Sequence, residues 1–305
     1  MKSRALLVAW LALAAPTTHA VIIAGTDGTT NTTAPGNGAP WDYVGTIGGA
    51  TGVFLGDYGG GGWVITANHV GLGDFLLNGV TYTAVGGSGV QIGGADLFVF
   101  QISSSPLLPN LALSATTPNA GASVTMIGNG LNRAAPELFW SVDTNGNPSG
   151  DTSGNAWIWT TRPDATGANT FGYNWGSGNT LRWGTNQITG TATFNSTSLL
   201  YTTFNAITGE AQGAVGDSGG GVFYQNGSTW ELTGIIAYIG TENNQPGSTA
   251  VFGNVTDFAD ISVYRSAILT AVPEPAGTAA WCAGLAAALA VWRRRRDRAG
   301  AGNGA

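Results

Sequence analysis

Short apolar runs broken by glycine are the pattern that most constrains the fold of this chain. The sequence has 305 residues, of which 49 are glycine, and short runs of β-branched and aromatic residues between turn-forming residues predict strands. The predicted strands are residues 53–55, 63–66, 80–83, 97–102, 124–127, 199–203, 221–224, 232–239 and 251–255. A helical spacing follows them at residues 258–269. The sequence therefore predicts an all-β domain with a short helix at its end.

Charge is sparse and mostly negative. Between residues 21 and 272 the basic side chains are Arg133, Arg162, Arg182 and Arg265, against fifteen carboxylates. This balance argues against nucleic acid and anionic membrane surfaces as partners. The single cysteine, Cys282, lies near the C-terminal end, so we expect a domain without disulfides.

A serine between glycines is the strongest chemical signal. Residues 216–220 read Gly-Asp-Ser-Gly-Gly, a turn that exposes the hydroxyl of Ser218. Glycine permits positive φ and close approach of a substrate backbone. Successive amides in such a turn can converge on a developing oxyanion. The turn is therefore a candidate nucleophile site.

A serine nucleophile needs a base, and His69 is the only histidine after residue 20. It ends the apolar run 63–70, where a structural histidine at a strand end is the alternative. Asp96 stands before the apolar run 97–102, and a carboxylate there is expected to be buried and paired. The three residues together favour a nucleophile, a base and an orienting carboxylate.

The order His69, Asp96, Ser218 and the local motifs resemble the trypsin/chymotrypsin-like serine protease family. Thr-Ala-Asn-His at 66–69, Ala-Asp-Leu-Phe-Val-Phe at 95–100 and Gly-Asp-Ser-Gly-Gly carry the resemblance, which spans roughly residues 22–270. It implies two packed antiparallel six-stranded Greek-key β-barrels and a short C-terminal helix. The expected bounds are about 21–105 for barrel 1, about 115–258 for barrel 2 and about 258–270 for the helix. Residues 103–109 would connect the barrels.

The resemblance also implies roles for individual residues. His69, Asp96 and Ser218 would form the catalytic triad, and the amides of Gly216 and Ser218 the oxyanion hole. Neither a metal nor an organic cofactor is expected. Gln212, Ala237, Tyr238, Ile239 and Ala250 would line the substrate pocket. The neutral Gln212 disfavours cleavage after Lys or Arg, and we expect small or medium apolar residues instead. Ala237 replaces a serine that in the family hydrogen-bonds the catalytic aspartate.

The N-terminal residues resemble a secretory signal peptide, residues 1–20, with a basic start, an apolar stretch and a small-residue cleavage site. Cleavage by signal peptidase after Ala20 would begin the mature domain, residues 21–271, at Val21; a cut one residue later would begin it at Ile22. In the family, the residue at the position of Asp217 pairs with such a freed ammonium. The alternative is an ordinary first strand.

The C-terminal residues 272–305 resemble a PEP-CTERM sorting signal. Pro-Glu-Pro at 273–275 precedes an apolar segment, about 276–292, and an arginine block at 293–296. This implies a Gram-negative bacterium and removal of the tail by an exosortase-type protease. A plain membrane anchor is the alternative. Both place the domain outside the cytoplasmic membrane: in the envelope, on the cell surface or, after tail removal, extracellular. The exopolysaccharide matrix is then a further expected partner.

The expected function is therefore that of an exported serine endopeptidase acting on proteins or peptides through an acyl-enzyme. Ester hydrolysis uses the same chemistry. A catalytically weak or inactive surface or matrix binding protein on a protease fold is the alternative class. Residues 133–195 contain Trp140, Trp157, Trp159, Trp175 and Trp183. These tryptophans either plug the second barrel or pack extra hairpins, or they stack on sugar rings or hold a peptide.

Overall fold

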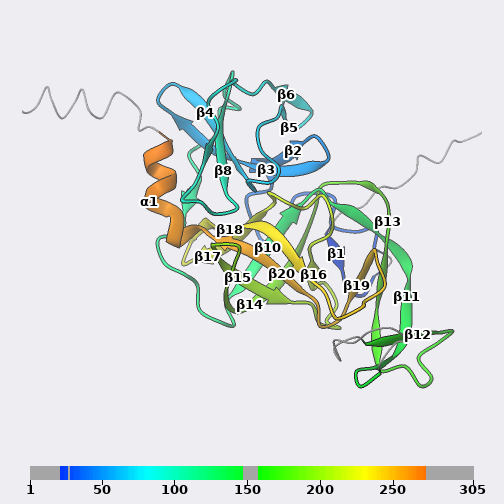
Figure 1. The fold of residues 1–305 in the computed structure, drawn as a ribbon. Coiled ribbons are helices and arrows are strands. Elements are labelled where there is room, and N and C mark those ends of the chain that lie inside the picture. The colour runs from blue at the N-terminus through cyan, green and yellow to red at the C-terminus, as the bar shows by residue number, and fades with distance from the viewer. Residues whose placement is uncertain (1–20, 27, 147–156, 273–305) are drawn as a thin grey trace, which may run out of the picture.

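The computed structural model describes residues 21–26, 28–146 and 157–272. In these ranges the protein consists mainly of strands, with one α-helix and one short 3-10 helix, η1 (Trp41–Tyr43). Figure 1 shows an N-terminal strand group above a C-terminal one, with further strands projecting from the latter.

The C-terminal strands close into a six-stranded antiparallel barrel. They are β10 (Ser123–Gly128), β14 (Arg182–Phe194), β15 (Thr197–Thr203), β17 (Gly221–Asn226), β18 (Thr229–Gly240) and β20 (Val255–Asp260). The order β17-β10-β14-β15-β20-β18 returns to β17 because β17 pairs with β18. Val124 and Met126, at the period of two that a strand requires, enter its core. The short β9 (Ala112–Leu113) adds to β18 in parallel.

The N-terminal strands form a seven-stranded antiparallel sheet that curls into a half-barrel. They are β2 (Val44–Ile47), β3 (Ala50–Tyr58), β4 (Gly61–Thr66), β5 (Phe75–Leu77), β6 (Val80–Tyr82), β7 (Val90–Gln91) and β8 (Phe98–Ile102). Their order is β6-β5-β2-β3-β4-β8-β7. A single bridge between Ala84 and Ile102 joins the chain after β6 to β8.

Both halves repeat one Greek-key order. In each half the first three strands are neighbours, a later strand lies beside the first, and the last lies beside the third. The predicted two-barrel architecture is therefore confirmed, with the first barrel only half closed. The short strands β5, β6 and β7 explain the difference, because segments of two or three residues supply few ladder hydrogen bonds.

A separate four-stranded sheet contains much of the tryptophan-rich segment, residues 133–195. Its strands are β11 (Leu131–Asp143), β12 (Ile158–Arg162), β13 (Thr170–Asn179) and β19 (Thr249–Val251), in the order β12-β11-β13-β19. Trp140 is buried and packs edge-on against Trp159, with 5.9 Å between ring centroids. These two tryptophans thus pack an extra sheet, the first of the two alternatives that the sequence left open.

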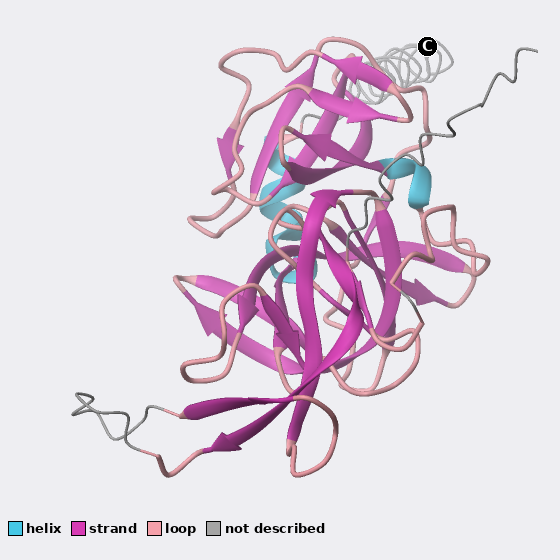
Figure 2. Ribbon diagram, turned by 90° about the vertical axis from the view of Figure 1, so that its right-hand side faces the viewer, coloured by secondary structure: helices cyan, strands magenta, loops and turns pink. Residues whose placement is uncertain are grey.

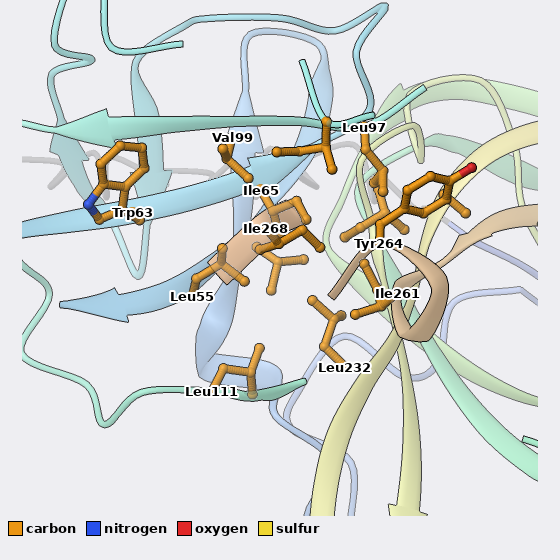
Figure 3. Packing of buried hydrophobic residues seen from close by; sticks show 14 of the residues in the cluster. Leu55, Trp63, Ile65, Leu97, Val99, Leu111, Leu232, Ile261, Tyr264 and Ile268 are labelled. Carbon is orange, nitrogen blue, oxygen red and sulfur yellow. The ribbon is translucent and has the colours of Figure 1, made fainter. Parts of the chain in front are cut away.

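The helix α1 (Ile261–Ala271) ties the two halves together. It begins where the Asp260 side chain accepts the Ser262 amide at 2.9 Å, an N-cap. Ile261 and Ile268 enter a core that holds residues of both halves (Figure 3), including Leu55, Ile65, Leu111 and Leu232. Figure 2 shows the helix beside both strand groups. This shared core fixes the relative position of the halves.

Two predicted segments differ from the structure in the kind of element that they form or in their place in the fold. Residues 258–260 pair as the end of β20, so the helix begins at Ile261 rather than at 258. Residues 251–255 are not one strand of the second barrel. Gly253, at φ +108°, turns the chain between β19 and β20, and the Asn254 side chain accepts the Val251 amide across that turn.

Within the described ranges no helix is long and apolar enough to cross a membrane. The expected signal peptide, the Pro-Glu-Pro motif, the apolar segment 276–292 and the arginine block lie outside the described residues.

Strand β20 carries a carboxyl group whose ionisation lowers stability. Burial raises the pKa of Asp257 from 3.8 to about 6. Because the folded-state pKa lies above the unfolded value, the proton is held more tightly in the folded protein, and stability falls as pH rises through about 6. We expect Asp257→Asn to raise the Tm at about pH 8 by roughly a few degrees, and to leave it unchanged at about pH 4. Thermal unfolding at both pH values measures this, and an equal Tm at the higher pH would contradict it.

Candidate active site

His69 lies in the loop that follows strand β4. The chain turns there because the Val70 amide donates back to the Ala67 carbonyl at 3.0 Å. The His69 side chain is 47% exposed. It lines an open cavity of about 430 Å³, together with Asp96 and Tyr238. One edge of the imidazole is thus accessible to a substrate.

Asp96 stands before strand β8 and is buried, with 8% of its side chain exposed. Its Oδ2 lies 2.8 Å from His69 Nδ1, and its Oδ1 accepts the His69 backbone amide at 3.0 Å. The Asp96 backbone amide donates to Thr197 Oγ1 at 2.8 Å. The carboxylate therefore fixes the imidazole at Nδ1 and leaves Nε2 to accept a proton.

Asp96 and His69 each shift the pKa of the other. The hydrogen bond that His69 donates to Asp96 raises the pKa of His69 above 6.5, against the opposite effect of burial. Burial alone would raise the pKa of Asp96, but the hydrogen bonds from His69 hold it below 3.8. At neutral pH the pair is thus a carboxylate beside an imidazole of increased basicity, which suits a general base.

Ser218 lies in the turn between β16 (Ala211–Gln212) and β17. The Thr51 amide on β3 donates to the Ser218 carbonyl at 2.9 Å, and Thr51 Oγ1 donates to the Gly216 carbonyl at 2.8 Å. Gly219 is at φ +84°, and a Cβ there would lie 2.0 Å from the Thr51 carbonyl oxygen. Only glycine fits this contact, which brings the serine of the barrel against the half-barrel that carries His69 and Asp96.

The amides of this turn alternate between bonded and free. Asp217 donates to Ala214 at 3.0 Å, and Gly219 donates to Ile236 at 2.8 Å. In the described part of the chain, the amides of Gly216 and Ser218 have no protein acceptor. In a trans peptide the N–H points opposite to the carbonyl of the same peptide group, so a hydrogen bond that fixes the carbonyl also orients the N–H. The Gly216 N–H shares its peptide group with the Val215 carbonyl, which accepts the Leu131 amide at 2.6 Å. The Ser218 N–H shares its peptide group with the Asp217 carbonyl, which accepts the Gly220 amide at 2.7 Å. Two fixed, unoccupied donors suit an oxyanion.

Ser218 and His69 are linked indirectly. Among the described residues no hydrogen bond joins the Ser218 hydroxyl to the imidazole. The connection runs through Thr66, three residues before His69, whose hydroxyl donates to the Thr51 carbonyl at 2.7 Å. Catalytic hydrogen bonds commonly tighten only when a substrate is bound.

Asp217 is fully buried and faces the N-terminal residues. Its carboxylate accepts the amides of Ala214 at 2.7 Å, Gly130 at 2.6 Å and Val21. Burial raises the pKa of Asp217 from 3.8 to about 7, although these bonds and the nearby Arg182 oppose the shift. The strand β1 (Ile22–Ile23) pairs with β16 and holds Val21 beside this carboxylate.

A buried arginine clamps the chain just after β1. Arg133 donates to the carbonyls of Ile23 at 2.7 Å, Gly25 at 2.6 Å and Thr26 at 2.6 Å. Its guanidinium also lies 4.0 Å from the centre of the Tyr173 ring, in a cation–π contact. The position of Val21 is thus fixed by β1 and by this clamp.

The five predicted pocket residues lie in different places. Ala237 and Tyr238 line the same cavity as His69, and Ile239 follows them on β18. Gln212 is fully buried and pairs with Ile22 in the β1–β16 ladder. Ala250 is fully buried on β19, opposite Tyr173. The predicted preference for small or medium apolar residues stays a prediction.

No group of three or more His, Cys, Asp and Glu side chains in the described ranges is arranged to hold a metal. The arrangement instead offers acid–base chemistry beside a serine and two free amides.

Three residues of the site were not singled out by sequence as supports. Thr51 donates to the carbonyls of Gly216 and Ser218, and Thr197 Oγ1 accepts the Asp96 amide. The Tyr238 hydroxyl lies close enough to the Asp96 carboxylate to influence its pKa. The only signal for the last was the neighbouring Ala237, where the family has a serine.

No protein-family model matches this chain, and no curated protein matches it either. Among solved structures, mouse neuropsin, a serine protease, is 15% identical and has a TM-score of 0.45, covering 78% of this chain and 96% of its own. Kallikrein-related peptidase 10 is 13% identical with a TM-score of 0.44, covering 75% and 94%. An inactive mutant form of Rv3671c from M. tuberculosis is 12% identical with a TM-score of 0.42, covering 75% and 86%.

Proposed function

We propose that this protein is a serine endopeptidase that cleaves proteins or peptides through an acyl-enzyme. The observation that carries the proposal is the Asp96–His69 pair, with 2.8 Å between Oδ2 and Nδ1, in the half-barrel that the Ser218 turn contacts. The free amides of Gly216 and Ser218 support the same reaction class, because acyl transfer develops negative charge on an oxygen.

The first half of the reaction forms the acyl-enzyme. Ser218 Oγ attacks the scissile carbonyl carbon while His69 Nε2 takes the hydroxyl proton. The former carbonyl oxygen becomes an oxyanion between the two free amides. The C–N bond then breaks, and His69 returns its proton to the leaving amine. Asp96 stabilises the imidazolium in both steps.

The second half hydrolyses the ester formed on Ser218. His69 takes a proton from water, the resulting hydroxide attacks the acyl carbon, and the same two amides hold the oxyanion. Collapse breaks the C–O bond, and the proton on His69 goes to Ser218 Oγ. Bonds and protons balance without a further reactant.

Removal of residues 1–20 would place an ammonium at Val21, whose nitrogen already donates to Asp217. We assign this pair to the ordering of the serine turn, because Asp217 lies between the two amides of the proposed oxyanion hole. Export, with a tail cut by an exosortase-type protease, belongs to the same proposal. It depends on the sequence of residues 1–20 and 273–305.

The rate should depend on pH through His69. The base must be neutral to accept a proton, and Asp96 raises the pKa of His69. We therefore expect kcat/KM to rise with pH through a value above 6.5, the usual histidine pKa. Asp96→Asn should lower kcat by about 10⁴-fold, as loss of the correct tautomer does in such triads. Peptide hydrolysis measured across the pH range checks both expectations. A kcat/KM that does not fall at acidic pH would contradict the assignment of His69 as the base.

A peptide library tests the substrate assignment. The secreted protein and its His69→Ala variant are incubated with the library, and the cut sites are read by mass spectrometry. We expect cleavage after small or medium apolar residues by the wild type, and none by the variant. Cuts dominated by Lys or Arg would overturn the specificity, and equal cutting by both proteins would overturn the assigned activity.

A further inference from the structure

The catalytic aspartate candidate has an unusual set of supports. In the resembled family a serine at the position of Ala237 hydrogen-bonds this carboxylate, and alanine has no hydroxyl to do so. The next residue, Tyr238, lines the same cavity as Asp96 and lies close enough to its carboxylate to influence its pKa. A hydroxyl is thus available one residue further along β18.

A tight hairpin holds the tyrosine in place. Phe194 pairs with Thr197 at the tip of β14 and β15, so Asn195 and Ser196 form a two-residue turn. Their φ values, +45° and +62°, are those of the turn type that fits the twist of paired strands. The Phe194 ring packs edge-on against Tyr238, with 5.1 Å between centroids.

Hydrogen-bonding groups surround the Tyr238 hydroxyl. The Asp96 amide donates to Thr197 Oγ1 at 2.8 Å. The side chains of Thr197 and Asn195 and the Asp96 carboxylate all lie near the Tyr238 hydroxyl and influence its pKa. Because a phenol has one proton and an ionised carboxylate only accepts, a hydrogen bond between Tyr238 and Asp96 would be donated by the tyrosine.

The same ring also contacts the base. The rings of Tyr238 and His69 are stacked, with 6.5 Å between centroids and 25° between planes. Tyr238 therefore lies beside both members of the Asp96–His69 pair. Its hydroxyl is near the carboxylate and its ring face lies along the imidazole.

We propose that Tyr238, locked by the 194–197 hairpin, is a positioning residue that orients Asp96 and His69 in place of the missing serine. This inference rests on the proposed function. It extends the active site to a hairpin tip of the second barrel, since Thr197 and Asn195 act through the tyrosine.

The decisive variant is Tyr238→Phe, which removes only the hydroxyl and keeps the ring. Loss of a hydrogen bond to a charged group should lower kcat by roughly ten-fold to a hundred-fold. KM should stay unchanged, because the ring that faces the cavity remains. The matched control is Tyr224→Phe, whose hydroxyl lies on β17, away from the cavity that His69 lines.

A titration separates positioning from packing. Without the tyrosine proton as a hydrogen-bond donor, the Asp96 carboxylate should stabilise the imidazolium more strongly. The pKa of His69 should therefore rise. The His69 resonances, assigned by their absence from His69→Ala, can be titrated by NMR even in protein that hydrolyses nothing. Failure of the proposed function and failure of this inference are therefore distinguishable.

The hairpin provides a second pair of variants. Thr197→Val leaves the Asp96 amide and the Tyr238 hydroxyl without their partner and should lower kcat similarly, whereas Thr197→Ser keeps the hydroxyl and should restore it. An unchanged or lowered pKa of His69 in Tyr238→Phe would overturn the inference. So would a change in KM alone, or equal activity of Thr197→Val and Thr197→Ser.

Discussion

The Ser218→Ala variant should lose peptide hydrolysis by about 10⁶-fold, the size of effect seen when the nucleophile of such a triad is removed. The hydroxyl oxygen is the atom that forms the acyl-enzyme, and alanine has no oxygen to replace it. His69→Ala should lose about as much, because nucleophile and base act as one unit. The double variant should be no worse than either single one.

The fold should survive this substitution. Ser218 is held through its backbone carbonyl, which accepts from Thr51, so alanine keeps the contact. Initial rates of the three variants and the wild type, with the Tm of each, make the comparison. Substantial hydrolysis by Ser218→Ala with an unchanged Tm would show that another group carries the reaction.

The second large effect concerns the buried carboxyl of Asp217. Its pKa of about 7 describes a chain whose Val21 nitrogen is an amide, and burial is the main cause. The folded-state pKa then exceeds the ordinary 3.8, so a chain still joined to residue 20 should lose stability as pH rises through about 7. A free Val21 ammonium should lower that pKa and remove the loss, because an opposite charge favours the carboxylate.

Two forms of the domain test this directly, one beginning at Val21 and one extended by residues before it. Urea unfolding at about pH 6 and pH 8.5 should give similar stability for the form that begins at Val21 and a clear loss for the extended form at the higher pH. Asp217→Asn should remove the difference between the forms. It should also lower kcat/KM by about 10²–10³-fold, the size of an oxyanion-hole defect.

The matched control is Asp257→Asn, another carboxyl with a raised pKa, replaced in the same way but outside the serine turn. It should keep full activity and preserve the difference between the two forms. Identical stability curves for the two wild-type forms at both pH values would contradict the pairing of Val21 with Asp217.

Local sequence motifs singled out residues that the structure brings close together, Asp96 with His69 and Asp217 with the Val21 nitrogen. Glycines on both sides of Ser218 and an apolar strand after Asp96 were the signals. The catalytic roles of these residues and a new N-terminus at Val21 stay predictions.

Features that depend on strand register were less predictable. Tyr238 and Ala237 are adjacent in sequence, and the β-bulge between Ile236 and Tyr238 on β18 shifts the strand register at this point. The extra sheet was left as an alternative because β13 is rich in Gly and Asn, which also occur in loops. The half-closed first barrel follows from short strands whose lengths propensity cannot fix.

Reaction with a fluorophosphonate probe tests the central claim most directly, because such probes modify only a serine that a neighbouring base has activated. The secreted protein, with its N-terminus sequenced, is labelled, digested and mapped by mass spectrometry. The proposed function predicts one modified residue, Ser218, and no labelling of Ser218→Ala or His69→Ala. Folded, processed protein that stays unlabelled, or carries the label elsewhere, would contradict it and favour a binding protein on a protease fold.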